Sequence, residues 1–575
     1  MKYQKNQYTP FTLMEINKSN SIYINTVLLL FGISFSIKYP QMETSYDTIV
    51  IGSGAGGMTA ALALALAGQK TLLCEKHKVA GGWTHSFSKE GYKFNTGVHY
   101  MGELHKGGTL RKIYEGLGVT EDLHFLEMNP DAYDHIQIGK ESFDIPKGEE
   151  RYKTRLIKRF PAEKEGIEKF FKKIREIQQF ATEFTRKNWK YLFFHAGTLI
   201  WFSRSGGQLV NKYLKDPLLR GIINSQIGIH GMPPKRLSVA FHTGGIMHYF
   251  NGAYHPLDGG QAISRAFLKK FKEAGGEVRL NITVKKILVG NRKVNGVELE
   301  DGEIIRAENI ISNADPSLTF MNLVGEEYLS RKLKKKISNI QYSTSCISLF
   351  LTVDLDLKNM GFDSGNYWLY DHADMDLNYE QAYTDHAVFD SPSGMFVTIT
   401  TLKDPTKMRN GHHQIEVFSL TGYEAFAKWE NKPKGKRGSE YEELKEEIAN
   451  RMLKKLELTF PGIRDSIVFR NLATPLTNKH YVNAPFGNLY GIEKSVKQMG
   501  PGSFAIKTEI KNLFLCGAST IGHGISPATQ SGLVAAAKVM NCRTKQLLNP
   551  KGYELQIFPA EEPGAWPDWL RKKLR

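Results

Sequence analysis

The chain has 575 residues, of which 41% are hydrophobic and 23% charged, and its formal net charge is +17. The length is too great for one compact core, so two intertwined domains are expected, and the composition is that of an ordinary globular protein. Cys74, Cys346, Cys516 and Cys542 lie far apart, which argues against a disulfide framework or zinc site and favours a reducing compartment. No nucleic-acid recognition motif accompanies the charge, so it indicates a solvated basic face or an anionic membrane surface.

Residues 1–44 are expected to form an N-terminal extension ahead of the folded domains. Residues 22–37 are an apolar run, which is shorter than the ~20 residues that span a bilayer. The run could be an uncleaved membrane anchor or an imperfect signal sequence. It could also be untranslated, because Met42 lies just before the first expected strand and would make a natural start. We expect the extension to be dispensable for the fold.

A dinucleotide-binding pattern occupies residues 46–75. A β-branched run leads into Gly52, Gly54 and Gly57, which have the G-x-G-x-x-G spacing. An Ala- and Leu-rich helical stretch follows, and then a second strand that ends at Glu75. Gly52 permits the tight turn, Gly54 leaves room for a pyrophosphate, and Gly57 lets the helix lie close to the sheet. The helix N-terminus attracts phosphate and Glu75 can accept ribose hydroxyls, so the pattern predicts a Rossmann-like domain.

The chain beyond this motif alternates helical and strand patterns. Gly81 and Gly82 mark a turn, a hairpin follows, and Gly97 lies in the loop beyond it. Apolar residues at helical spacing over 159–184 predict a helix packed on the core. The denser aromatic run 191–202 suits either a buried helix or one that lines the mouth of a lipophilic pocket.

Later segments complete the expected domains. A helix is expected from Ala262, strands within 277–316, and a last strand over 512–516 that runs into a glycine-rich loop and another helix. We therefore predict an α/β fold with a discontinuous nucleotide-binding domain and a mixed α+β substrate domain. The nucleotide-binding segments are 45–150, 256–330 and 481–545. The substrate segments are 151–255, which would also face a membrane, and 331–480, and residues 546–575 form a C-terminal tail.

Several separated motifs resemble the phytoene desaturase-like FAD-dependent oxidoreductases. They are the dinucleotide pattern, Gly81–Gly82, FNTGVHYMG at 94–102, YHPLDGG at 254–260, SNADP at 312–316 and FLCGASTIGHGISPATQSG at 514–532. Within that family the chain is most similar to the retinol saturase (all-trans-retinol 13,14-reductase) and carotenoid isomerase groups, through RFPAEKEGIEKFF at 159–171, GMPP at 231–234 and HYFNGAYHPLDGG at 248–260. The similarity runs from about residue 46 to about residue 539 and implies an amine-oxidase-like fold.

The resemblance implies FAD as the cofactor. The residues expected to bind it are Gly52, Gly54, Gly57, Glu75, Gly81, Gly82, Gly97, Val284, Gly517, Ser519 and Gly524. The first four would hold the ADP half, and Val284 would approach the adenine. Gly517, Ser519 and the junction from Gly524 would offer backbone N–H groups and a helix N-terminus to the flavin or its ribityl chain.

Reduction of a C=C bond adds a hydride to one carbon and a proton to the other, so an acid is wanted beside the flavin. The candidates are His99, which we favour, Tyr100, His248, Tyr249 and His523. The sequence has no Ser/His/Asp triad signature, no metal-ligand spacing and no competing pair of carboxylates. It also has no second G-x-G-x-x-G, so either an outside reductant supplies electrons or NAD or NADP binds without this fingerprint.

Three functions stay open. The leading hypothesis is a flavin-dependent reductase of retinoid- or carotenoid-like polyenes, and the second is a carotenoid desaturase or cis–trans isomerase. The third is a non-catalytic escort that binds FAD and a lipid. A lipophilic polyene substrate suits the aromatic run and the basic charge, so we expect a peripheral membrane protein at the cytoplasmic face or in another reducing compartment, with no nucleic-acid partner.

Overall fold

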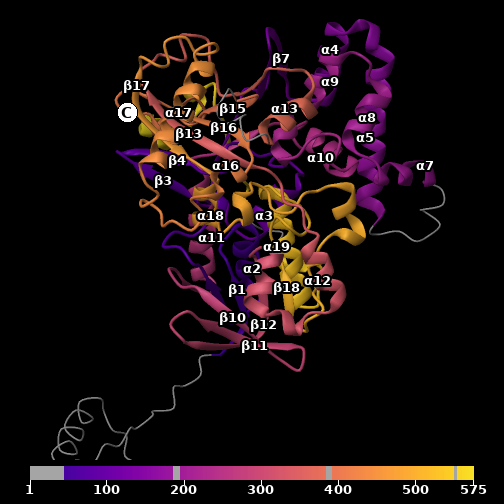
Figure 1. The fold of residues 1–575 in the computed structure, drawn as a ribbon, viewed down its shortest axis with the longest axis vertical. Coiled ribbons are helices and arrows are strands. Elements are labelled where there is room, and N and C mark those ends of the chain that lie inside the picture. The colour runs from indigo at the N-terminus through magenta and orange to yellow at the C-terminus, as the bar shows by residue number, and fades with distance from the viewer. Residues whose placement is uncertain (1–44, 185–194, 384–391, 550–552, 575) are drawn as a thin grey trace, which may run out of the picture. The chain divides into compact units, whose positions relative to one another are not determined.

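Two large sheets organise the unit Ser45–Arg575. The computed structural model describes residues 45–184, 195–383, 392–549 and 553–574 (Figure 1). The N-terminal extension with its apolar run 22–37 lies outside the described residues, as do residues 191–194 of the aromatic run. Within the described ranges, no helix combines the length and the apolar character that crossing a bilayer requires.

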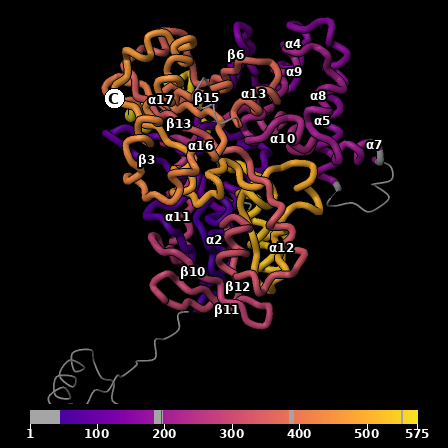
Figure 2. The backbone as a smooth tube through the Cα atoms, viewed as in Figure 1, coloured from indigo at the N-terminus to yellow at the C-terminus, as the bar shows by residue number. Residues whose placement is uncertain are grey.

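The first large sheet contains the dinucleotide motif. Its strands lie in the order β10-β11-β12-β1-β2-β9, and β18 also pairs with β12. Strands β9, β2, β1, β12 and β18 pair in parallel, whereas β10, β11 and β12 pair antiparallel. The bounds are β1 Ser45–Ile51, β2 Thr71–Cys74, β9 Glu277–Arg279, β10 Val284–Gly290, β11 Lys293–Leu299, β12 Ile304–Ser312 and β18 Leu513–Leu515. N-terminal, central and C-terminal segments therefore meet in one sheet, as the mixed colours around it indicate (Figure 2).

The second large sheet has the order β17-β13-β16-β15-β14-β6-β7. Its bounds are β6 Asp134–Ile138, β7 Glu141–Ile145, β13 Ser345–Val353, β14 Asn366–Tyr370, β15 Gly394–Ile399, β16 His413–Thr421 and β17 Ile467–Ala473. Strands β6 and β7 fall within the segment 45–150 that we assigned to the nucleotide-binding domain. They pair here instead, because β6 runs parallel to β14, a strand far away in the sequence. The boundary of that segment therefore lies before residue 134.

Helices cover the first sheet and flank the second. Helices α2 (Ala55–Leu66) and α19 (Ile525–Val539) pack side by side (Figure 1). The predicted helix over 159–184 is α5 (Lys164–Phe184), and its apolar stripe packs in a buried cluster, as expected. Beside it lie α4 (Glu149–Arg159), α8 (Gly206–Tyr213) and α10 (Val239–His248). Helix α9 (Pro217–Asn224), which comes between α8 and α10 in the sequence, packs against α8.

The other described strands form two small sheets. The predicted hairpin is β3 Ser86–Lys89 and β4 Tyr92–Asn95, and a small sheet joins β5 Phe125–Glu127, β8 Tyr254–Pro256 and β19 Ile557–Pro559. The C-terminal tail is thus held by strand pairing. Other helices are α3 Thr109–Gly116, α7 Ala196–Leu199, α11 Gly260–Glu273, α12 Arg331–Ser338, α13 Met375–Tyr383, α15 Thr400–Lys403, α16 Glu424–Ala427, α17 Ser439–Leu456, α18 Pro475–Val482 and α20 Asp568–Arg571.

Candidate active site

A cavity of about 1700 Å³ is lined both by the dinucleotide motif and by the second sheet. One end is formed by glycine turns and the N-termini of α2 and α19, and the other end by aromatic side chains of α10, β14, β15 and β16. Pockets for one small molecule usually measure about 300–1,000 Å³. The cavity therefore has room for a cofactor and a second ligand together.

At the first end, the β1–α2 turn presents bare backbone. Gly52 has a φ of +90°, and a Cβ built on Gly57 would lie 2.0 Å from the Gly52 carbonyl oxygen. Gly54 is the N-cap of α2 and no side chain caps it, so first-turn N–H groups of the helix remain available to a ligand. A Cβ on Gly54 would lie 2.6 Å from Asn313 Nδ2. The turn is thus built to let a phosphate approach a helix N-terminus.

Helix α19 repeats this arrangement from the other end of the chain. Its N-cap is Gly524, again without a side-chain cap. The two helices cross closely, because a Cβ on Gly532 would lie 2.0 Å from the Gly56 carbonyl oxygen. Gly517 differs from expectation in one respect: its N–H already donates to Ser531 Oγ at 2.7 Å. The α19 N-terminus, rather than the Gly517 amide, is therefore the donor that this junction offers.

Glu75 lies at the end of β2, on the cavity wall. Its Oε2 accepts hydrogen bonds from the Ser53 N–H at 2.9 Å and the Ser53 hydroxyl at 2.5 Å, and its Oε1 accepts one from the His77 N–H at 2.9 Å. Ser53 Oγ in turn accepts from the Gly81 N–H. The carboxylate therefore fixes the glycine turns to each other, and its remaining lone pairs are the ones that a ribose would use.

The other predicted cofactor residues lie around the same end. Gly81, Gly82, Gly97, Val284 and Ser519 all line the cavity, whereas Gly57 lies beneath the turn. Val284 begins β10 and is 7% exposed. A Cβ on Gly82, whose φ is +53°, would lie 3.3 Å from the Gly54 Cα. This cradle, with two uncapped helix N-termini and a ribose-binding carboxylate, fits the ADP half and ribityl chain of FAD.

The second end of the cavity is aromatic. Its rings include Tyr100, Phe241, Tyr249, Trp368, Tyr370, Phe396, Phe418 and Tyr490. Tyr100 and Tyr249 stack with centroids 4.5 Å apart and planes 11° from parallel. Leu199 and Phe202, from the aromatic run, also line the cavity, and Ile200 between them is 57% exposed. The described part of that run therefore favours the position at a pocket mouth over a buried helix.

His99 has the geometry expected of an acid. Its Nδ1 lies 2.9 Å from Glu416 Oε2, and neither atom has another hydrogen-bond partner among the described residues. Glu416 is fully buried on β16, and its Oε1 accepts from the Asn95 N–H at 2.6 Å. The His99 side chain lines the cavity and is 13% exposed, and no hydrogen bond from a described residue reaches its Nε2. Nε2 is thus the ring nitrogen free to meet a ligand.

Tyr100 and His248 line the same cavity, but their polar atoms already have partners. The Tyr100 hydroxyl donates to Asp134 Oδ2 at 3.3 Å. Burial, together with the Asp134 charge, raises the pKa of Tyr100 well above its usual range. His248 Nε2 accepts the Gly102 N–H at 3.1 Å, and burial lowers the pKa of this imidazole. These contacts favour structural roles for both residues.

A buried charged network lies behind His99. Lys403 Nζ donates to Asn366 Oδ1 and, at 3.1 Å, to the His99 carbonyl oxygen. Asn366 Nδ2 donates to Asp134 Oδ1 at 2.8 Å. Burial lowers the pKa of Lys403 to about 7 and raises that of Asp134 to about 6. The network pins the segment that carries His99 and Tyr100 to the second sheet.

Four of these site residues were not singled out from the sequence. Asn313 lies in the quoted SNADP motif, and its side chain is packed between the Gly54 turn and Gly517. Glu416 had a usable signal, since it is the one acidic residue of its strand and lies between two apolar residues, Ile415 and Val417. Lys403 carried no comparable signal, and neither did His230, which also lines the cavity. Among the described residues, no three His, Cys, Asp or Glu side chains are arranged to hold a metal ion.

Comparison with known proteins agrees with this geometry. A model of flavin containing amine oxidoreductases matches residues 55–540. The chain is 28% identical to all-trans-retinol 13,14-reductase of Danio rerio over 532 residues, which cover 87% of either protein. It is 27% identical to chloroplastic prolycopene isomerase of Daucus carota, covering 86% of this chain and 80% of that one. Cyclohexylamine oxidase from Brevibacterium oxydans IH-35A shares the fold, with a TM-score of 0.54, 14% identity and coverage of 87% and 99%.

The family match spans most of the chain and includes α2, β12 and α19, which form the glycine cradle. It confirms the predicted α/β fold with an FAD-binding domain, and it confirms FAD as the cofactor of an oxidoreductase. The chain therefore belongs to the family of flavin containing amine oxidoreductases.

Proposed function

We propose that this flavoenzyme reduces a C=C bond of a retinoid- or carotenoid-like polyene. The observation that carries the proposal is the position of His99, whose free Nε2 lies on an aromatic cavity continuous with the FAD cradle. Flat aromatic walls suit a flat, apolar polyene. Two relatives of the chain are named for polyene substrates, one as a retinol reductase and the other as a prolycopene isomerase, and this supports the substrate class.

The chain's own residues supply the proton. The glycine cradle at Gly52, Gly54 and Gly524 would hold FAD, whose reduced form would supply the hydride for one carbon of the double bond. His99 donates a proton from Nε2 to the other carbon, and the Glu416 carboxylate at 2.9 Å stabilises the imidazolium before transfer. The aromatic side chains exclude water and hold the polyene in one plane. An outside reductant, NAD or NADP among the candidates, must return two electrons after each turnover.

Anaerobic single-turnover mixing tests the proposal. Holoenzyme reduced with dithionite is mixed with all-trans-retinol and, separately, with prolycopene. We expect flavin reoxidation in step with the loss of one double bond. A change of double-bond geometry with the flavin still reduced would instead favour the second candidate, an isomerase, to which the 27% identical relative points. Binding without either change would favour an escort and contradict the proposal.

We also propose that the protein docks on a membrane surface in a reducing compartment. Its cysteines are all free in the structure. Leu199 and Ile200 are exposed beside the cavity, and Leu199 also lines it, so an apolar substrate could pass from a bilayer without crossing water. The formal net charge of +17 would favour an anionic lipid surface.

Sedimentation with liposomes that contain anionic lipid tests this docking. Ile200→Asp should reduce the pelleted fraction, because a charge replaces an apolar contact at the cavity mouth. Leu458→Asp is the matched control, since Leu458 is 81% exposed but does not line the cavity. An equal loss for both variants, or no pelleting of the unaltered protein, would contradict the docking surface.

A further inference from the structure

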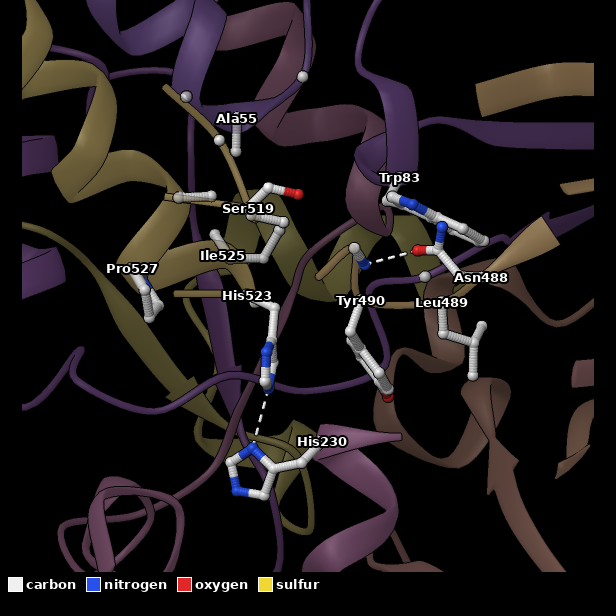
Figure 3. Close-up of a pocket in the computed structure, with 18 of the residues that line it drawn as sticks. Ala55, Trp83, His230, Asn488, Leu489, Tyr490, Ser519, His523, Ile525 and Pro527 are labelled. Carbon is white, nitrogen blue, oxygen red and sulfur yellow. Dashed lines mark hydrogen bonds between the residues drawn. The ribbon is translucent and has the colours of Figure 1, made fainter. Parts of the chain in front are cut away.

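Two buried histidines from distant parts of the chain form a hydrogen bond in the wall of the cavity. His230 Nδ1 and His523 Nε2 are 2.8 Å apart (Figure 3). His230 follows α9, whereas His523 lies in the loop before α19. Phe241 and Tyr490 contact the His523 ring, with centroids 5.6 and 5.0 Å away. The pair is therefore a polar group set in aromatic surroundings.

The tautomers of His230 and His523 follow from which ring nitrogens lack a hydrogen-bond partner. His523 Nδ1 is buried and has no hydrogen-bond partner among the described residues. A buried N–H without a partner is rarer in proteins than an unsatisfied acceptor. His523 therefore carries its proton on Nε2 and donates it to His230 Nδ1. It follows that neutral His230 carries its own proton on the remaining nitrogen, Nε2.

His230 Nε2 is on the side of the ring that packs over α10. His230 lines the cavity, and a Cβ built on Gly245 would lie 2.4 Å from this nitrogen. No hydrogen bond from a described residue reaches it. Burial lowers the pKa of His230 to about 3 and that of His523 well below its usual range, so the pair is neutral at ordinary pH. His230 thus presents a fixed, uncharged N–H donor.

We propose that His230 Nε2–H recognises an oxygen atom at the polar end of the polyene, so that the site prefers an alcohol or carbonyl compound to the matching hydrocarbon. The inference rests on the proposed function for its polyene, and it assigns the specificity to His230 rather than to the proton donor His99. An uncharged donor suits an uncharged oxygen, because neither partner has to bury a net charge. His523 acts as the positioning residue that fixes the ring and its tautomer.

The test measures binding, and turnover is recorded separately. Oxidised holoenzyme is titrated with all-trans-retinol and with the hydrocarbon in which hydrogen replaces its hydroxyl group, following the flavin absorbance. The unaltered protein should bind the alcohol about tenfold more tightly, the scale of one good hydrogen bond. His230→Phe keeps an aromatic ring without a donor and should bring the ratio to about one, with affinity for the hydrocarbon retained.

A glycine pair supplies a second, independent perturbation. Gly245→Ala puts a methyl group against His230 Nε2 and should also abolish the preference. Gly244→Ala is the matched control: its Cβ would meet Gln178 Nε2 at 3.4 Å, an ordinary contact, and should leave the tenfold ratio unchanged. Because neither change removes a polar group, a folding defect in His230→Phe would not obscure the result.

The outcomes separate this inference from the proposed function. A ratio near one in the unaltered protein, or a tenfold ratio that survives both His230→Phe and Gly245→Ala, would overturn the inference. So would a change in the ligand-free flavin spectrum of His230→Phe, since the donor would then serve the cofactor. If the protein binds the alcohol selectively, but the polyene keeps all its double bonds after the flavin is reduced, the inference about His230 stands and the proposed reductase activity is refuted. Failure to bind either polyene would refute both.

Discussion

The two ends of the cavity are made from different chemical groups. The cofactor end is a surface of glycines and backbone N–H groups, at which Gly52, Gly54 and Gly524 leave two helix N-termini uncapped. The substrate end is a set of large rings interrupted by buried polar side chains, of which His99 lies beside Glu416. The first end can hold any dinucleotide of the right shape. The second end must choose the substrate and deliver the proton.

The two ends of the cavity should therefore differ in which substitutions they accept. A backbone cradle tolerates no added side chain, because a Cβ on Gly57 or Gly532 would lie 2.0 Å from a carbonyl oxygen. The substrate end should tolerate volume-conserving changes of its rings far better than changes of its few polar groups, whose hydrogen bonds have no substitutes. Substitutions at the two ends should therefore fail in different ways, by loss of flavin at one and by loss of turnover at the other.

The largest effect is expected at His99. His99→Gln should keep FAD bound and reducible but slow C=C reduction by about 10²–10⁴-fold, because a positioned general acid contributes about that much. Stopped-flow reoxidation of the reduced flavin by the polyene measures the rate. A variant that retains a tenth or more of the normal rate would exclude His99 as the proton donor.

The next effect concerns the cofactor end. Gly57→Ala should cost about 1–3 kcal/mol or more in free energy of unfolding, since its Cβ overlaps backbone that cannot move away cheaply. The protein should also purify with little or no flavin, as its absorbance near 450 nm would report. Gly564→Ala serves as the control, because nothing lies within 4 Å of the added methyl. Full flavin content in Gly57→Ala would contradict the cradle.

Glu416→Gln tests whether the buried carboxylate assists His99. The change keeps the shape of the side chain but removes the charge that stabilises an imidazolium 2.9 Å away. Contacts of this kind contribute about 1.5–3 kcal/mol, so the single-turnover rate should fall about ten- to hundredfold with FAD content unchanged. Glu416→Asp retains the charge and should recover part of the rate. Equal rates for Gln and Asp would indicate a purely structural carboxylate.

The last effect leaves turnover aside and is a pH dependence of stability to which Lys403 contributes. Burial lowers its folded pKa to about 7, whereas an unfolded lysine titrates near pH 10.4. Between these values the unfolded chain binds more protons, so the free energy of unfolding should rise with pH from about 7 to 10, by at most about 1.4 kcal/mol per unit. Denaturant unfolding should show a steeper rise in the unaltered protein than in Lys403→Met, in which other buried lysines such as Lys494, whose pKa burial lowers to about 8, still contribute. Parallel curves would contradict a buried, neutralised Lys403.

The cofactor end was predictable from sequence and the substrate end largely was not. Gly52, Gly54 and Gly57 lie close together in the chain, so their spacing alone implied the turn and its ligand. Glu416 reaches His99 only through the pairing of β16 in the second sheet, and His230 reaches His523 only when α9 and the C-terminal loop meet. The same reason explains the misplaced boundary at β6, because its pairing with β14 depends on a strand far away in the sequence.

A structure of the holoenzyme with a bound polyene alcohol would show whether one cavity holds the cofactor and the substrate together. We predict FAD on the glycine cradle and the polyene among the aromatic rings of the same cavity, in contact with the flavin ring and with His99 Nε2. A polyene bound elsewhere, or a protein wall between the polyene and the flavin, would contradict the account.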